Sequence, residues 1–283
     1  METGRIQYFA YMDNHFNVHH SVSENCEDPF TKLHMHSMYE LYLFLDGEGY
    51  FRVSGNNYKL EPGMIMFMRP GEAHSLYVSK NKKYERVSIH FDGECFVNMP
   101  DVAEMLASFT KLESGIGNCY MPDDDKSYCM KLFEQMTSND NTDNVSKRLS
   151  LVSTIPALLF HLKKKLSDYT QPENVSTDSL VRQIVRYIDE NLYYRWSLDD
   201  LAASLYRDKA YLNRRFKKEV GTGIWDYTIR KRIIGIKQRI HAFADVNEAF
   251  RASGFGDYSS FFRNYVKITG NTPSEDIKNT NAQ

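Results

Sequence analysis

The sequence predicts a multidomain α+β protein, in which a β-rich N-terminal domain is followed by a chain that is helical to its end. Its 283 residues exceed what one modest core needs, so at least two domains are expected. From Phe9 to about Asp92 short runs of Tyr, Phe, Val and Ile alternate with Gly, Asn and Pro, as in strands joined by turns. From about residue 101 the apolar residues recur at three- and four-residue steps, which is the helical period.

The β-rich part is predicted to be a sandwich or barrel over residues 1–100. The stretch "ELYLFLDGEGYFRVSGNNYKLEPGMIMFMRPGEAHSLYV" carries the turn signals "DGEG", "GNN" and "EPG" at the spacing of successive hairpins. Alternation in "YFRVSG" is typical of a strand with one buried face. We therefore expect antiparallel strands throughout this part.

Residues 101–167 are predicted to form a helical segment with two amphipathic helices. The stretches "DDKSYCMKLFEQM" and "VSKRLSLVSTIPALLFHLKKKL" place Leu, Ile, Val and Phe on one side of each helix, and Pro156 should kink the second helix. These helices either cover the β domain or form a homodimer interface at about 124–166. The polar stretch that follows, residues 168–179, is expected to be an interdomain linker, which leaves 180–283 as the C-terminal domain.

The charge of the chain is divided unevenly. Residues 1–175 hold 17 Lys and Arg against 24 Asp and Glu, a net charge of −7, whereas residues 176–283 hold 18 against 13, a net charge of +5. This asymmetry favours a C-terminal module that binds a polyanion. No stretch resembles a spanning helix or a secretory signal, and the four cysteines are scattered, so we expect a cytoplasmic protein with reduced thiols and no membrane partner.

Two segments of the C-terminal part share one layout, a short helix, a tight turn and a second helix with interleaved Arg and Lys. They are "LDDLAASLYRDKAYLNRRFKKEVG" and "VNEAFRASGFGDYSSFFRNYVKITG". Their alignment places Arg214 on Arg263 and Gly221 on Gly270. We therefore predict a duplicated helix-turn-helix, with Ser197, Asp200 and Asp208 as helix caps. The apolar positions expected in its core are Leu201, Ala202, Leu205, Leu212, Phe216, Phe255, Phe261 and Tyr265.

Residues 180–277 resemble the DNA-binding domain of the AraC/XylS family of bacterial transcription regulators. The resemblance is carried by "SLDDLA", "YLNRRFKKEVG" and above all "SGFGDYSSFFRNYVKITGNTPSED". It implies two recognition helices on one face of the domain, joined by a long helix at about 224–240 and reaching adjacent segments of the major groove. Asp245 stands where the family commonly has a Ser or Thr cap.

The resemblance also implies which residues contact double-stranded promoter DNA. In the first recognition helix Ala210, Asn213 and Arg214 would face bases, with Lys217 and Lys218 near phosphates. Arg214, Arg263 and Asn213 are the predicted direct readers, because Arg can bind guanine and Asn can bind adenine with two hydrogen bonds. The lysines would add affinity that depends on salt. The second helix would offer Tyr258, Ser259, Phe262 and Arg263.

Histidines gather in the β-rich part. "HMHSMYELYLFLDG" supplies His34, His36 and Glu40, and "GMIMFMRPGEAH" adds His74. This spacing resembles the cupin pattern, in which an HxHxxxE string and a later His converge inside a β-barrel. We predict that these four residues, with Tyr42 and Phe44, contact a small-molecule effector; binding of a divalent metal by the same four residues is the less favoured alternative. His90, in "VSIHF", is expected to be structural.

Together these features predict a transcription regulator with no cofactor, controlled by an effector such as a sugar, a sugar derivative or another small polar molecule. It would bind DNA as a homodimer, and would contact RNA polymerase if it activates transcription. The principal alternative is a metal-dependent cupin enzyme with a helical C-terminal domain. A third is a DNA-binding protein whose β domain binds a protein partner instead of a metabolite.

Overall fold

The computed structural model describes residues 5–26, 33–121, 124–138, 143–166, 175–177 and 179–281. The chain divides into two compact units, one built mainly from residues up to Ser176 and the other mainly from residues after it. Each unit is described by itself below. Within the described residues, no helix is both long and apolar enough to cross a membrane.

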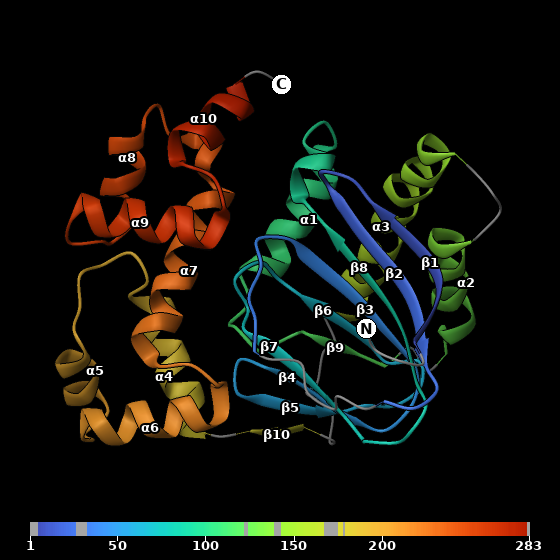
Figure 1. Cartoon of the computed structure of the whole chain (residues 1–283), viewed down its shortest axis with the longest axis horizontal. Helices are drawn as coiled ribbons and strands as arrows, with labels where there is room; N and C mark the ends of the chain where they lie inside the picture. The colour runs from blue at the N-terminus through green and yellow to red at the C-terminus, as the bar shows by residue number, and fades with distance from the viewer. Residues whose placement is uncertain are drawn as a thin grey trace. The chain divides into compact units, whose positions relative to one another are not determined.

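The N-terminal unit contains two sheets, and the neighbouring strands among β1 to β9 pair antiparallel. A six-stranded sheet has the order β1-β2-β8-β3-β6-β9, and a four-stranded sheet has the order β10-β5-β4-β7 (Figure 1). The bounds of the strands are β1 Arg5–Met12, β2 Phe16–Ser23, β3 Tyr39–Asp46, β4 Gly49–Val53, β5 Asn56–Lys59, β6 Ile65–Met68, β7 His74–Val78, β8 Tyr84–Phe91, β9 Cys119–Tyr120 and β10 Val175–Thr177.

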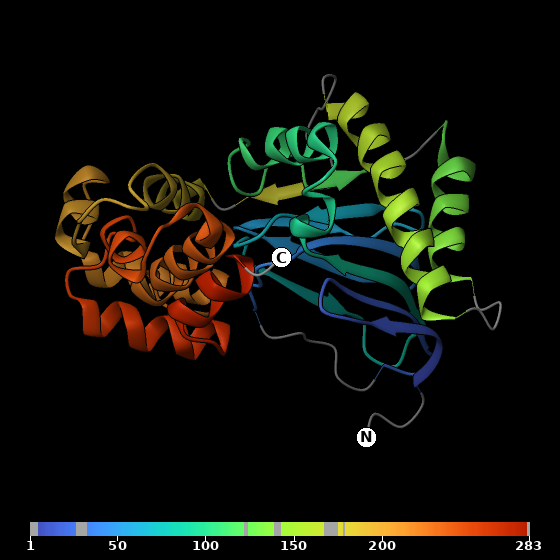
Figure 2. The ribbon, with the colours of Figure 1, turned by 90° about the horizontal axis from the view of Figure 1, so that it is seen from above.

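Alternation along β3 separates the two cores of this unit. Leu41 and Leu43 lie in a core shared with the helices α1 (Pro100–Thr110), α2 (Lys126–Thr137) and α3 (Asn144–Leu166), which cover one face of the six-stranded sheet (Figure 2). Tyr42 and Phe44 lie in the second core, together with residues of the four-stranded sheet such as Phe51. Because successive strand residues point to opposite faces, Glu40 also faces the second core.

Two features of this unit differ from the sequence prediction. The helical segment contains α1 in addition to the two predicted helices. Pro156 lies inside α3, and the kink expected there stays a prediction. The structure describes only 175–177 and 179 of the predicted linker, and Val175–Thr177 forms β10, which joins β5 at the edge of the four-stranded sheet. The polar stretch thus contains a short strand, because the backbone groups at the edge of a sheet can pair with a further segment of chain.

The C-terminal unit is all helical. Its helices are α4 Ser179–Glu190, α5 Leu198–Ser204, α6 Lys209–Val220, α7 Ile224–Gln238, α8 Val246–Arg251, α9 Tyr258–Thr269 and α10 Pro273–Asn281. The long helix α7 lies between α6 and α9 and serves two cores (Figure 1): Ile224 and Tyr227 pack with α4 and α6, whereas Ile233 and Ile236 pack with α9. The predicted core residues Leu201, Leu212, Phe216, Phe255, Phe261 and Tyr265 are buried, and Ala202 and Leu205 are partly buried.

Candidate functional sites

The helices α6 and α9 are built alike, as the internal repeat predicts. Each has 12 residues and is preceded by an N-cap Asp, Asp208 or Asp257, whose side chain accepts a hydrogen bond from a backbone N–H in the first turn. Each ends at a glycine in the left-handed conformation, with φ of 83° at Gly221 and 82° at Gly270. Such caps satisfy the unpaired backbone groups at both helix ends, so the two helices start and stop at equivalent positions.

Both helices bury an apolar stripe and expose basic and polar side chains. In α6 the buried residues are Leu212, Phe216 and Val220, and in α9 they are Phe261 and Tyr265. The predicted contact residues Ala210, Arg214, Lys217 and Lys218 of α6, and Tyr258, Ser259 and Arg263 of α9, are exposed; Phe262 is partly buried. The exposed side of each helix thus carries arginine or lysine side chains, which suit a polyanionic partner.

Asn213 also has a role inside the domain. Its Oδ1 accepts a hydrogen bond of 3.0 Å from the backbone N–H of Ile224, at the first residue of α7. This bond caps α7 and joins it to α6. A bidentate contact with adenine needs the oxygen and the nitrogen of the amide, and the bond to Ile224 uses one of the two lone pairs of the oxygen, so base reading by Asn213 stays a prediction.

The predicted caps of the short helices are confirmed. Ser197 and Asp200 form a capping box at the start of α5, in which each side chain accepts a bond from the backbone N–H of the other residue. Asp245 accepts a bond from the N–H of Glu248 at the start of α8, so it replaces the hydroxyl cap common in the family. Each helix that precedes α6 or α9 is thus also fixed at its first turn.

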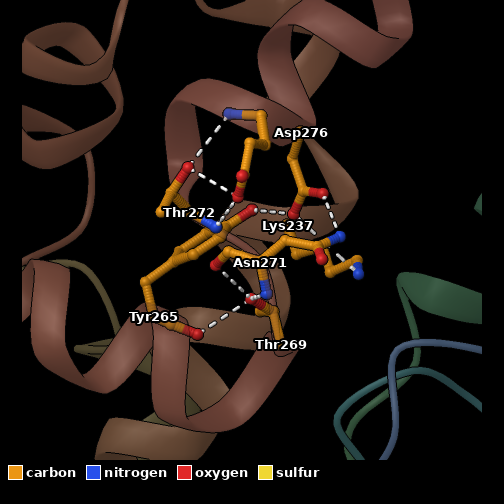
Figure 3. Close-up of polar contacts among 7 residues, drawn as sticks. Lys237, Tyr265, Thr269, Asn271, Thr272 and Asp276 are labelled. Carbon is orange, nitrogen blue, oxygen red and sulfur yellow. Dashed lines mark hydrogen bonds and ion pairs between the residues drawn. The ribbon is translucent and has the colours of Figure 1, made fainter.

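A buried polar network holds α9 in place (Figure 3). The hydroxyl of Tyr265 donates to Asp276 Oδ2 at 2.8 Å, and the amide of Asn271 donates to Asp276 Oδ1 at 2.8 Å. Lys237 of α7 places its Nζ 3.9 Å from Asp276 Oδ2. The network joins α7, α9 and α10, and burial together with the Asp276 bond raises the pKa of Tyr265.

An aromatic group covers the N-terminal end of α9. The ring of Tyr258 lies 5.7 Å from that of Phe250 in an edge contact and 6.1 Å from that of Phe262 in a stacked arrangement. Tyr258 still exposes 41% of its surface. The aromatic side chains predicted at the second contact helix are therefore packed against the domain and also accessible at its surface.

In the N-terminal unit a buried carboxylate on β3 has polar partners on β7 and β8. Glu40 Oε1 accepts a hydrogen bond of 3.0 Å from Ser88 Oγ, and its Oε2 lies 3.2 Å from His74 Nε2 and 3.5 Å from His90 Nε2. Glu40 is 5% exposed and His74 is 1% exposed. Burial lowers the pKa of His90, but the charge of Glu40 and its hydrogen bond outweigh this effect, so the pKa is raised overall.

The region of Glu40 also contains a pair of buried tyrosines and an aromatic wall. The hydroxyls of Tyr42 and Tyr84 lie 2.7 Å apart. Burial raises the pKa of Tyr42 well above its ordinary value and that of Tyr84 to about 12, so both phenols are neutral at physiological pH. Phe51 contacts Tyr42 edge-on at 4.9 Å and stacks on His74 at 5.9 Å.

His90, predicted to be structural, is a further member of this group. It is paired with Glu40 in the register of β3 and β8. A signal is present in the sequence: alternate residues of β8, namely Tyr84, Arg86, Ser88 and His90, are all polar or aromatic. Since the side-chain period of a strand is two, these residues share one face.

The four residues of the cupin-like pattern also come together. One ligand atom from each of His34, His36, Glu40 and His74 lies within 4.8 Å of the other three. Three imidazoles and a carboxylate form a donor set that divalent transition metals accept. This set could therefore hold a metal ion as well as hydrogen-bond an organic ligand.

Comparison with known proteins assigns both units. Residues 17–185 match the family model of the AraC-like ligand binding domain, and residues 201–279 match that of a helix-turn-helix domain. The chain is 21% identical over 228 residues to the lactose operon transcription activator of Staphylococcus xylosus, covering 80% of this chain and 79% of the relative. It is 21% identical over 244 residues to the arabinose operon regulatory protein of Escherichia coli, covering 84% and 79%.

Among solved structures, the chain is similar to ToxT K231A of Vibrio cholerae, with a TM-score of 0.42 and 12% identity over 94% of this chain and 98% of that one. The two family models define an effector-binding transcription regulator with a helix-turn-helix DNA-binding domain, not an enzyme. Because the ligand-binding model alone spans more than half of the chain, the protein belongs to the AraC family. The alternative of a metal-dependent cupin enzyme is thereby excluded.

Proposed function

We propose that the protein reads a specific promoter sequence with α6 and α9. The observation that supports this most directly is the matched construction of the two helices, which start at Asp208 and Asp257 and present Arg214 and Arg263 at equivalent exposed positions. Exposed arginines on a helix that enters the major groove can form two hydrogen bonds with guanine. Asn213 is the third proposed reader, of adenine, since its bond to the N–H of Ile224 uses only one of the two lone pairs of its oxygen.

The remaining predicted residues have supporting roles in this proposal. Lys217 and Lys218, near the end of α6, contact phosphates and add affinity without sequence preference. Ala210 and Ser259 are small and exposed, which allows close approach of a base edge. Tyr258 and Phe262 offer an aromatic surface that suits a thymine methyl group.

We further propose that the effector is a small polyhydroxylated molecule, such as a sugar, contacted by Glu40, Tyr42 and His74. A buried carboxylate flanked by imidazoles can accept and donate hydrogen bonds to neighbouring hydroxyls, and an aromatic ring such as Phe51 can pack on the apolar face of a sugar. His90 joins these contacts through Glu40, and His34 and His36 complete the proposed set. The relatives named for lactose and arabinose operons agree with this class of ligand.

We also propose that the protein is a homodimer that uses α3. Three apolar residues one to four turns apart on this helix are largely exposed: Val145 at 77%, Leu149 at 66% and Phe160 at 59%. Their spacing of 4 and 11 positions puts them on one face, and exposed apolar faces of this kind are typical of helix–helix interfaces. Contact with RNA polymerase is part of the proposal only if the output is activation.

Three experiments test these proposals. Selection from a random duplex library with the full chain should enrich one sequence motif, and enrichment of no motif would contradict sequence-specific reading. A thermal-shift screen of the full chain should show a higher melting temperature with sugars than with divalent metals, because a ligand that prefers the native state stabilises it. Stabilisation by a metal alone would favour the metal-binding alternative.

Light scattering on wild type and Leu149→Glu tests the dimer, which the substitution should dissociate.

A further inference from the structure

Arg232, near the middle of α7, connects the two halves of the C-terminal unit. It is 2% exposed and donates three hydrogen bonds to backbone carbonyls. Its Nε donates to Leu192 at 2.6 Å and its Nη2 to Tyr194 at 2.6 Å, both in the loop between α4 and α5. Its Nη1 donates to Gly254 at 2.8 Å, in the turn between α8 and α9. One guanidinium therefore bonds the segment that leads into the first motif and the turn of the second.

Tyr193, between the two loop carbonyls, fills the space beside this connection. A methyl group at Gly235 of α7 would overlap the Tyr193 hydroxyl, and one at Gly254 would lie 2.9 Å from the carbonyl carbon of Tyr193. Gly254 also has a φ of 75°, which favours glycine. On the other side, the guanidinium of Arg239 lies 4.3 Å from the centre of the Tyr193 ring. The loop is thus packed tightly against both α7 and the second turn.

The chemistry of arginine suits this connection. A buried guanidinium is costly unless its donors are satisfied, and its planar, rigid fork can serve several carbonyls in fixed directions. α7 has its N-terminal part in one core and its C-terminal part in another. If α7 alone joined the two cores, they could rotate relative to each other more easily. Hydrogen bonds from the side of α7 to a segment of each half restrict this rotation.

We propose that Arg232 is the positioning residue that fixes the second helix-turn-helix relative to the first, with Tyr193 as its packing partner. The spacing and rotation between α6 and α9 are then set in the protein before DNA is bound. This inference rests on the proposed function, since the two helices must read one duplex for their relative position to affect binding. Arg232 touches no DNA in this scheme and acts through the two turns.

The test compares Arg232→Ala with wild type on two duplexes: the sequence selected from the random library by wild type, and the same sequence with one base pair inserted between its two half-sites. The insertion rotates one half-site by about 35°. Wild type should bind the inserted duplex at least about tenfold more weakly, whereas Arg232→Ala should lose about tenfold on the original duplex and discriminate less than about threefold. Arg230→Ala, on the exposed side of α7, is the matched control and should keep the wild-type ratio.

The ratio between duplexes separates positioning from a loss of stability. A variant that is only less stable loses affinity for both duplexes by the same factor and keeps the wild-type ratio, and that result would overturn the proposal. If Arg232→Ala does not fold, Gly235→Ala serves instead, because it displaces Tyr193 without removing a charge. Adding Tyr193→Phe should restore the ratio, since the nearest remaining ring carbon lies 3.2 Å from the new methyl group.

Hydrogen exchange on the full chain without DNA gives a second readout. Arg232→Ala should raise exchange both in the loop 191–197 and in the turn 253–256, at least about tenfold in each, because bonds to a charged donor hold both segments. Faster exchange in the loop alone would show that the two motifs are not connected through Arg232. If wild type selects no DNA sequence, the proposed function is wrong. The exchange result then still shows whether Arg232 connects the loop 191–197 to the turn 253–256.

Discussion

Tyr265→Phe should destabilise the C-terminal unit by about 1.5 kcal/mol. The substitution keeps the buried ring and removes only the hydroxyl, which donates to the Asp276 carboxylate at 2.8 Å (Figure 3). A hydrogen bond to a charged group contributes about 1.5 to 3 kcal/mol. We expect the lower end of this range, because Asp276 keeps its bond from Asn271 at 2.8 Å and Lys237 remains 3.9 Å away.

The two tryptophans of the chain make the assay specific. Trp196 and Trp225 both lie in the C-terminal unit, with ring centres 5.4 Å apart, so urea unfolding followed by tryptophan fluorescence reports on this unit. Tyr206→Phe, at a side chain that is 88% exposed, is the control and should change the free energy of unfolding by less than about 0.5 kcal/mol. If Tyr265→Phe changed it no more than this control, the buried bond would have no net stabilising role.

Three further predictions concern DNA reading, thiol reactivity and alkaline stability. Arg214→Ala should cost about 1 to 3 kcal/mol of binding free energy on the selected duplex and relax base preference, whereas Lys217→Ala should weaken binding to all duplexes evenly. In anisotropy titrations at several salt concentrations, Lys217→Ala should also reduce the slope of log K against log salt concentration by about one. Equal losses on selected and random DNA for Arg214→Ala would contradict its role. Burial raises the pKa of the Cys119 thiol to about 12, so it should react with iodoacetamide at least about tenfold more slowly in the native than in the unfolded chain, by mass spectrometry of the labelled peptide. Burial also raises the pKa of Tyr84 to about 12, because the folded state favours the neutral phenol. The contribution of this group to stability is present below about pH 10 and is lost as pH rises toward 12. Urea titrations should therefore show that the free energy of unfolding falls less at alkaline pH in Tyr84→Phe than in wild type.

Much of the C-terminal unit is predictable from the sequence because its signals are local. Helix caps such as Asp208 and Asp245 act within three residues, and the buried stripe of Leu212 and Phe216 repeats at helical spacing. The duplication added a second, independent copy of the same pattern. These signals predicted the helices, their core faces and the family, which the structure and the family models confirm.

The candidate sites were less predictable because their polar residues are bonded to distant parts of the chain. The oxygen of Asn213, a predicted base reader, also caps a helix that begins 11 residues further on. His90, predicted to be structural, is brought to Glu40 only by the pairing of β3 with β8. The identity of a polar residue does not tell whether its side chain is hydrogen-bonded within the protein or available to bind a ligand.

The sequence by itself determined most of the helices and strands, the face that each of them buries and the family of the chain, because these properties depend on periodicity and on contacts within a few residues. It did not predict α1 or β10. The tertiary structure decided which polar groups are used internally and how the two motifs are joined. Arg232 shows the reason: its three carbonyl partners lie 22 to 40 positions away, a separation at which no local pattern specifies a hydrogen bond. Such bonds arise only when the packed cores bring the segments together.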